Sequence, residues 1–232
     1  MSADRAEALR RSWHDVAARV AASCRSHGRS PEGVSVIAVT KGFPASDVVA
    51  LARIGVTDVG ESRDGEARLK KEQVEAAGVT TLTWHAIGQV QTNKAASIAR
   101  WADLVHSVDR LRLVAALAST GVGRDVLIQV RAGSSVAGSD GRAGATSADV
   151  RELADAIDGC GSLRLRGVMV VAEPGEPARP QFERAAEVWA QLRQGRDGVD
   201  VFSAGMSGDF DDAIAAGATH LRIGTAILGG RL

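Results

Sequence analysis

The stretch Val34-Ser35-Val36-Ile37-Ala38-Val39-Thr40-Lys41 runs directly into Gly42-Phe43-Pro44. Its small and β-branched apolar residues are typical of a buried strand, and the glycine and proline that follow are typical of its end. Lys41 therefore stands at the carboxyl end of a strand. Burial there disfavours the charged form of an amine and favours the neutral form, which can attack an aldehyde. The alternative is an ordinary solvated lysine at a strand end.

The same strand and helix unit recurs along the whole chain. Strands are predicted at residues 34–41, 57–60, 82–88, 104–108, 125–132, 163–171, 199–204 and 220–226. Helices are predicted between them at residues 45–54, 64–77, 93–99, 110–119, 147–157, 181–193 and 209–216. Strands that alternate with helices form a parallel sheet, and about eight of them fit a closed barrel better than an open sheet. The predicted fold class is an α/β (β/α)8 TIM-type barrel.

An amphipathic helix precedes the first strand. Apolar residues recur at intervals of three and four between residues 6 and 24, which predicts a helix that packs on a larger body. The segment 227–232 after the eighth strand is too short for a final helix, so we expect the first helix to cover that side. The prediction is one domain over residues 1–232, with residues 1–30 packed on the barrel.

The charges of the chain balance, with 28 Lys plus Arg against 28 Asp plus Glu. This balance lacks the global field typical of nucleic-acid or anionic-membrane binding, so a small-molecule ligand is favoured. No apolar run approaches the roughly 18 residues of a membrane span, and the N-terminus lacks the apolar core of a signal peptide. We therefore expect a cytoplasmic protein. We also expect a monomer, because no apolar surface stripe is unaccounted for.

Metal and disulfide sites are not expected. Cys24 and Cys160 lie far apart, without a C-x-x-C partner or nearby histidines. His85 and His106 end neighbouring strands, but no third ligand stands at suitable spacing. The basic run Arg68-Leu69-Lys70-Lys71 lies on a helix rich in glutamate, which indicates a solvated face.

Two adjacent loops predict a phosphate site. They carry Ser203-Ala204-Gly205-Met206-Ser207-Gly208 and Arg222-Ile223-Gly224-Thr225-Ala226, after the seventh and eighth strands. Glycines at positions 205 and 224 let backbone N–H groups approach an anion, and Ser207 and Thr225 add hydroxyl donors. The helix that begins near Asp209 points its N-terminus at the same place. Barrels commonly hold phosphate here, although a helix-capping serine and turn glycines are the alternative for each residue alone.

Arg222 stands two residues before Gly224, so its side chain is predicted to point into the barrel. A phosphate at one end and the Lys41 amine at the other imply a phosphorylated aldehyde of moderate size. Pyridoxal 5′-phosphate fits, with its ring nitrogen facing Arg222 and its aldehyde meeting Lys41. A structural ion pair between Arg222 and an acidic residue such as Glu61 is the alternative.

The order of these motifs resembles that of the pyridoxal phosphate homeostasis proteins. The resemblance rests on Ala38-Val39-Thr40-Lys41, Gly60-Glu61, Trp84-His85-Ala86-Ile87-Gly88, Gln91-Thr92-Asn93-Lys94, His106-Ser107-Val108-Asp109, Leu165-Arg166-Gly167-Val168-Met169, Gly205-Met206-Ser207 and Arg222-Ile223-Gly224-Thr225-Ala226. It covers the chain from the N-terminal helix nearly to the C-terminus, and many independent motifs occur in the same order.

The resemblance implies a barrel like the N-terminal domain of alanine racemase, with Lys41 as the Schiff-base lysine and Arg222 near the pyridine nitrogen. Its members bind and buffer the cofactor for other enzymes, so apo-enzymes are the expected partners and no turnover is expected. The resemblance also implies that the phosphate is held by Ser203, Ser207, Gly224 and Thr225. The other cofactor-binding residues expected are Gly205, Ser62 and His85. For His85 a hydrogen-bonded core histidine is favoured, and a role in orienting other groups is the alternative.

Two departures from the family pattern limit which family properties can be expected of this chain. Ser62-Arg63 stands where the family usually has Asn-Tyr, so a hydroxyl and a cation replace an amide and an aromatic ring. Arg142 stands about where the family has a loop lysine that has been proposed to accept the cofactor during transfer. A guanidinium does not form an imine, so Arg142 is expected to attract the cofactor electrostatically at most.

Two enzymatic alternatives use the same lysine. An amino-acid racemase of this barrel type needs a second base, commonly a tyrosine from a C-terminal domain of a partner subunit, and this sequence has no tyrosine. An arginine at the pyridine nitrogen also leaves the ring unprotonated and a weak electron sink. A Schiff-base aldolase acting on a sugar phosphate lacks an evident acid–base group beside Lys41.

Overall fold

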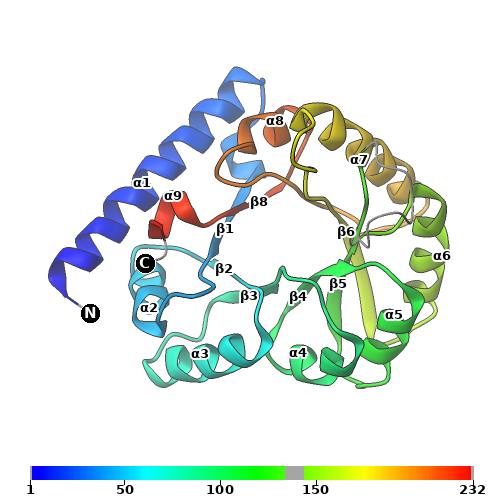
Figure 1. The fold of residues 1–232 in the computed structure, drawn as a ribbon, viewed down its shortest axis with the longest axis horizontal. Helices are drawn as coiled ribbons and strands as arrows, with labels where there is room; N and C mark the ends of the chain where they lie inside the picture. Colours follow the sequence, from blue (N-terminus) through cyan, green and yellow to red (C-terminus); the bar gives the residue numbers. More distant parts are fainter. Residues whose placement is uncertain (1, 134–143, 231–232) are drawn as a thin grey trace.

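The computed structural model describes residues 2–133 and 144–230, which form a closed barrel of eight parallel strands in chain order (Figure 1). The strands are β1 (Ser35–Val39), β2 (Asp58–Glu61), β3 (Thr83–Ala86), β4 (Leu104–Val108), β5 (Arg124–Gln129), β6 (Leu163–Met169), β7 (Val201–Ser203) and β8 (His220–Ile223). Strand β1 pairs with both β2 and β8, which closes the barrel. The predicted fold class is confirmed.

Helices surround the barrel and cover the outward faces of its strands (Figure 1). They are α1 (Ala3–Ser26), α2 (Ala45–Arg53), α3 (Asp64–Ala76), α4 (Ala95–Trp101), α5 (Leu111–Ala118), α6 (Ser147–Asp158), α7 (Ala178–Arg193), α8 (Phe210–Ala215) and α9 (Thr225–Leu228). Short 3₁₀ turns span Pro31–Gly33 and Thr92–Lys94. None of the helices in the described ranges has the length and apolar character needed to cross a membrane.

Two apolar layers result from the alternation of side chains along the strands. Outward residues such as Leu221 and Ile223 join the large core between the strands and the helices. The barrel interior holds a second, smaller apolar cluster of Leu104, Leu127, Met169 and Val201. The interior also holds the buried polar side chains of His85, His106, Ser203 and Arg222, which is unusual for a packed barrel core.

The C-terminal end of the barrel differs from the prediction. We expected a strand through residue 226 and no final helix, but β8 ends at Ile223, and the four-residue helix α9 begins at Thr225, directly after Gly224. Helix α1 lies against α2, α8 and α9, as expected for a helix that covers this side (Figure 1). Arg5 on α1 holds this contact, because its guanidinium bonds the buried Asp47 carboxylate at 2.6 Å and the Leu228 carbonyl at 3.1 Å.

Four neighbouring strands, in the order β7, β8, β1 and β2, carry the residues of interest. Register pairs join Ser203 with His220, Ile223 with Ala38, and Val39 with Gly60. The carboxyl ends of parallel strands lie on the same rim, so the segments that follow these four strands form one continuous arc.

Candidate functional site

Lys41 stands on the turn that follows β1, at the carboxyl rim of the barrel. Its side chain is half-buried, and Gly42 behind it adopts a positive φ of 80°, which turns the chain away from the strand. No hydrogen bond or ion pair joins the Lys41 amine to another residue of the described ranges. The amine is therefore available to a ligand at the rim.

A buried polar cluster holds the residues on either side of Lys41. Lys70 on α3 donates to the Thr40 carbonyl at 2.8 Å and pairs with Glu61 at 2.5 Å and Glu66 at 2.8 Å. The Thr40 hydroxyl donates to the same Glu61 oxygen at 2.7 Å, and the Gly42 N–H donates to Glu66 at 2.5 Å. The backbone before and after Lys41 is thus anchored to α3.

Burial and pairing act in opposite directions on the two carboxyl groups of this cluster. Burial raises the pKa of Glu61, although the hydrogen bonds from Lys70 and Thr40 oppose that rise. Burial alone would also raise the pKa of Glu66, but the hydrogen bonds from Lys70 and Gly42 outweigh it, so the pKa of Glu66 is lowered. The two carboxyl groups share one ammonium, which is the positive charge of the cluster.

The loop after β7 is built around Gly205. Its φ is 85°, and a Cβ there would lie 2.6 Å from the Ala213 Cβ on α8, so this position requires glycine. The Gly205 carbonyl accepts the Arg222 N–H at 2.9 Å, and the Met206 N–H donates to Asp209 at 2.5 Å. These contacts fix the backbone on which Ser207 stands, half-buried at the rim.

The loop after β8 lies between that segment and Lys41. Gly224 packs against Val39 of β1, where an added Cβ would lie 3.3 Å from the Val39 Cβ. Thr225 begins α9 with an exposed side chain, and the first N–H groups of a helix have no intrahelical acceptor. Asp211 faces away from both loops, because it bonds Ser23 on α1. Polar donors from two adjacent loops therefore meet beside Lys41.

Arg222 points into the barrel, as predicted, and its side chain is 4% exposed. Its guanidinium donates to the Ser203 hydroxyl at 2.7 Å and to the Val170 carbonyl at 2.8 Å. Burial lowers the pKa of Arg222 to about 10. The alternative of an ion pair with Glu61 is wrong, because Glu61 faces α3 and pairs with Lys70.

Ser203 has partners different from those we expected. Its side chain is fully buried, and its oxygen contacts both Arg222 and, at 3.0 Å, the Nδ1 atom of His106. A hydroxyl group has one proton, and the guanidinium is a donor only, so that proton goes to His106. The Ser203 hydroxyl therefore has no proton left for a phosphate.

His85 lies in the barrel interior and not at the carboxyl rim. Its ring bonds Asp58 at 2.9 Å and His106 at 2.9 Å, and it lines a cavity of about 360 Å³ at the amino-terminal end of the barrel. It therefore faces the end opposite to Lys41, as a hydrogen-bonded core histidine and not as a cofactor-binding residue of the rim. Within the described ranges no group of three or more histidine, cysteine or acidic side chains could hold a metal.

The remaining predicted residues lie at the rim or outside the described ranges. Ser62 follows β2 and is half-buried, and its Cβ would lie 2.7 Å from any Cβ added to Gly88. The Arg63 side chain is exposed and lies 3.9 Å from Glu66. Arg142 lies outside the described residues.

Sequence reasoning missed the role of Lys70. We expected a solvated helix face, yet the Lys70 side chain is only 4% exposed and points at β1 and β2. The spacing of Glu66 and Lys70, four residues apart, indicates that they pair on one helix face. A buried strand-end glutamate at position 61 was the signal that a cation was needed there.

Comparisons with known proteins identify the family of this chain. The family model of the alanine racemase N-terminal domain matches residues 17–232. The pyridoxal phosphate homeostasis protein of Corynebacterium glutamicum is 38% identical over 226 residues, which cover 92% of this chain and 98% of that protein. The protein of the same name from Escherichia coli K12 is 36% identical over 220 residues, which cover 92% of each.

A solved structure extends the comparison to three dimensions. The structure of PipY from Synechococcus elongatus with PLP bound has a TM-score of 0.75 and 32% identity, and covers 92% of this chain and 100% of that one. Matches of this identity and coverage show common descent as well as a common fold. The chain therefore belongs to the pyridoxal phosphate homeostasis proteins, within the family of the alanine racemase N-terminal domain.

Proposed function

We propose that this protein binds pyridoxal 5′-phosphate and serves the homeostasis of that cofactor in the cytoplasm. The relatives named above carry that function in their names, and PipY is described with the cofactor bound. The observation that carries the proposal is the half-buried Lys41 amine, unpaired within the described ranges, beside two glycine and hydroxyl loops. When bound, the cofactor supplies an aldehyde that can form an imine with a lysine.

The four lysines of the chain support Lys41 as the attachment point. They are Lys41, Lys70, Lys71 and Lys94. Lys70 is buried and shared between two carboxylates, and Lys71 donates to the Trp101 carbonyl at 3.0 Å. Lys94 is exposed, and it follows β3, which is separated from β1 by β2. Only Lys41 combines partial burial with an unpaired amine on the arc that carries the phosphate loops.

The rest of the arc fits the two polar ends of the cofactor. Gly205, Ser207, Gly224 and Thr225 hold the phosphate through backbone N–H and hydroxyl donors. Arg222 donates to the pyridine nitrogen, which acts as an acceptor because a guanidinium has no acceptor of its own. Ser62 completes the rim on the β2 side. Ser203 acts through Arg222 and not on the phosphate.

We further propose that the protein holds the cofactor without turnover and acts as a monomer that supplies apo-enzymes. The sequence has no tyrosine to serve as the second base of a racemase. An arginine at the pyridine nitrogen leaves the ring unprotonated, which weakens it as an electron sink. Purified protein is expected to show no alanine or serine racemisation above the buffer control, and robust racemisation would overturn this part of the proposal.

Replacing Lys41 tests the attachment. In Lys41→Ala, the visible imine absorbance that follows mixing with pyridoxal phosphate is expected to disappear, because no other lysine of the site can replace it. Borohydride reduction of the unaltered protein, followed by peptide mass analysis, is expected to place the added mass on Lys41. Lys71→Ala is the matched control, because the Lys71 amine is engaged with the Trp101 carbonyl, and it is expected to keep full absorbance. Undiminished absorbance in Lys41→Ala would refute the proposal.

A further inference from the structure

A continuous chain of hydrogen bonds crosses the interior of the barrel. Asp58 bonds His85 Nε2 at 2.9 Å, and His85 Nδ1 bonds His106 Nε2 at 2.9 Å. His106 Nδ1 bonds the Ser203 hydroxyl at 3.0 Å, and that hydroxyl accepts from Arg222 at 2.7 Å. We call these five residues the interior chain. It connects the first residue of β2, at the amino-terminal mouth, with Arg222 beneath the carboxyl rim.

The chemistry of the end groups fixes the direction of every donor. Arg222 can only donate, so Ser203 accepts from it and passes its own proton to His106 Nδ1. His106 then carries its proton on Nε2 and donates to His85, and His85 donates from Nε2 to Asp58. Burial holds the pKa of His106 well below its usual value, so this ring stays neutral. Burial alone would raise the pKa of Asp58, but the hydrogen bonds from His85 and Thr57 outweigh it and lower the pKa. Asp58 is therefore a carboxylate.

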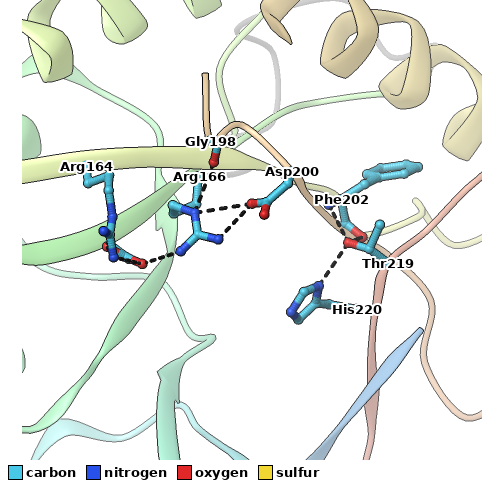
Figure 2. Close-up of polar contacts among 8 residues, drawn as sticks. Arg164, Arg166, Gly198, Asp200, Phe202, Thr219 and His220 are labelled. Carbon is cyan, nitrogen blue, oxygen red and sulfur yellow. Dashed lines mark hydrogen bonds and ion pairs between the residues drawn. The ribbon is translucent and has the colours of Figure 1, made fainter. Parts of the chain in front are cut away.

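Several other charges at the amino-terminal mouth are paired with one another. Figure 2 shows Arg166 donating to Asp200, at 2.8 Å, and to the Gly198 carbonyl. Arg166 also bonds Asp125 at 2.7 Å, and Asp125 accepts from Arg164 as well. These groups approach the interior from β5, β6 and the segment before β7.

Three further titratable groups border the same cavity. His220 of β8 bonds the Thr219 hydroxyl, and burial lowers its pKa to about 4, so it is neutral near pH 7. Asp103 accepts the Trp84 N–H at 2.8 Å, and Glu32 stands on the turn before β1. Among the carboxylates of the described residues that border this cavity, Asp58 is the one that bonds a histidine of the interior chain.

We propose that the interior chain is a positioning device that orients Arg222 and couples the carboxylate at the amino-terminal mouth to the pyridine nitrogen of the cofactor. This inference rests on the proposed function, in which Arg222 faces that nitrogen. Asp58, His85, His106 and Ser203 touch no part of the cofactor and act through Arg222. One guanidinium N–H is committed to Ser203 and another to Val170, which leaves a defined set of donors for the ring. The negative charge at the far end compensates the buried cation through aligned hydrogen bonds.

The first test needs no cofactor. The chain has five histidines, so ¹⁵N-resolved NMR of the imidazole rings can assign each tautomer in the protein alone. Both His85 and His106 are expected to be neutral with the proton on Nε2, and the Nε2 protons are expected to exchange slowly. A proton on His106 Nδ1, or a charged His106 near pH 7, would overturn the proposal whether or not the cofactor binds.

The second test measures coupling across the barrel. Asp58→Asn keeps the size of the side chain but removes the charge. With ¹⁵N-labelled pyridoxal phosphate bound, it is expected to shift the resonance of the pyridine nitrogen. It is also expected to weaken cofactor binding by roughly threefold, because an amide oxygen is a weaker acceptor for the His85 N–H than a carboxylate. Asp200→Asn is the matched control, because it removes a carboxylate from the same mouth that bonds Arg166 instead, and it is expected to leave the resonance in place.

A double variant separates the interior chain from a general electrostatic effect. Ser203→Ala removes the central link with little change in volume. In that background Asp58→Asn is expected to shift the pyridine nitrogen no further, and an equal shift with and without Ser203 would overturn the proposal. Equal shifts from Asp58→Asn and Asp200→Asn would overturn it too. If the unaltered protein shows no imine absorbance, the proposed function itself has failed, and the tautomer measurement still decides whether the interior chain has the proposed direction.

Discussion

Thr40 and Gly42, the two neighbours of Lys41, both bond side chains that belong to or contact α3. At the scale of single residues, Lys70 is the centre of this arrangement, because its ammonium bonds a backbone carbonyl and two carboxylates. A reactive amine needs a fixed backbone below it, since small displacements of a reacting group cost much of its effectiveness. The Lys70 cluster supplies that fixed backbone.

Replacing Lys70 is expected to destabilise the protein strongly. Lys70→Met leaves the fully buried Glu61 carboxylate without a cation, which costs about 3 kcal/mol in free energy of unfolding. The double variant Lys70→Met with Glu61→Met is expected to recover most of that loss, because two apolar side chains of similar volume replace the pair. Urea denaturation measures both values.

Lys71→Met provides the control on the same helix. Lys71 is partly exposed and bonds one carbonyl, so its loss is expected to cost about 1 kcal/mol or less. Equal losses from Lys70→Met and Lys71→Met would show that the buried cluster contributes no special stability.

At the scale of elements, the loop from β7 to α8 depends on one glycine. Gly205→Ala is expected to lower the free energy of unfolding by about 2 kcal/mol, because a left-handed φ and a contact of 2.6 Å with Ala213 both disfavour a Cβ. The affinity for pyridoxal phosphate should fall with it, since the same loop holds the phosphate in the proposed function. Thermal unfolding and absorbance titration are the measurements.

The same loop offers a control position. Gly208 has no left-handed φ, and a Cβ there would meet nothing within 4 Å. Gly208→Ala is therefore expected to change stability by less than about 0.5 kcal/mol. A comparable loss of stability in both variants would show that the loop needs glycine at position 205 no more than at position 208.

The existence of nearly every element could be predicted from the sequence, but the last boundary could not. The run from His220 to Leu228 is apolar on alternate and adjacent positions alike, so it is consistent with one long strand. Pairing with β1 ends near Ile223, and the chain then turns at Gly224 into α9. A short helix of this kind is selected by its packing against α1, which local sequence does not reveal.

At the scale of the whole molecule, the barrel and its rim were predictable because both follow from order along the chain. Alternating strands and helices imply a parallel barrel, and strand ends imply one rim. The directions of individual side chains were not predictable in the same way. Ser203 and His85 lie near strand ends, yet both bond His106 in the barrel interior and neither faces the rim. Buried polar groups need hydrogen-bond partners, and here they find them in each other.

The stability of the whole molecule is expected to fall as the pH drops below neutrality. Burial lowers the pKa of His220 to about 4 and holds that of His106 well below its usual value, while the unfolded chain binds a proton on each near pH 6.5. The stability is therefore fully present above pH 6.5 and is lost as the pH falls toward 4. For His220 alone the free energy of unfolding should be roughly 2 kcal/mol lower at pH 5 than at pH 7.

Urea denaturation at the two pH values checks this expectation. His220→Gln should reduce the difference between pH 7 and pH 5, because glutamine does not titrate. His14→Gln, at an exposed position of α1, should retain the difference. An unchanged difference in His220→Gln would assign the pH dependence to other groups.

The seam between β1 and β8 has a consequence for how the protein is made. Lys41 follows β1, the strand of the barrel that is synthesised first, whereas Arg222 and Thr225 belong to β8 and the helix after it. In the proposed function, the two halves of the cofactor site therefore meet only after all eight strands have been made. Imine colour should accordingly require a chain that extends through α9, and a chain cut short before β8 should not take up the cofactor, however much of the barrel it has already formed.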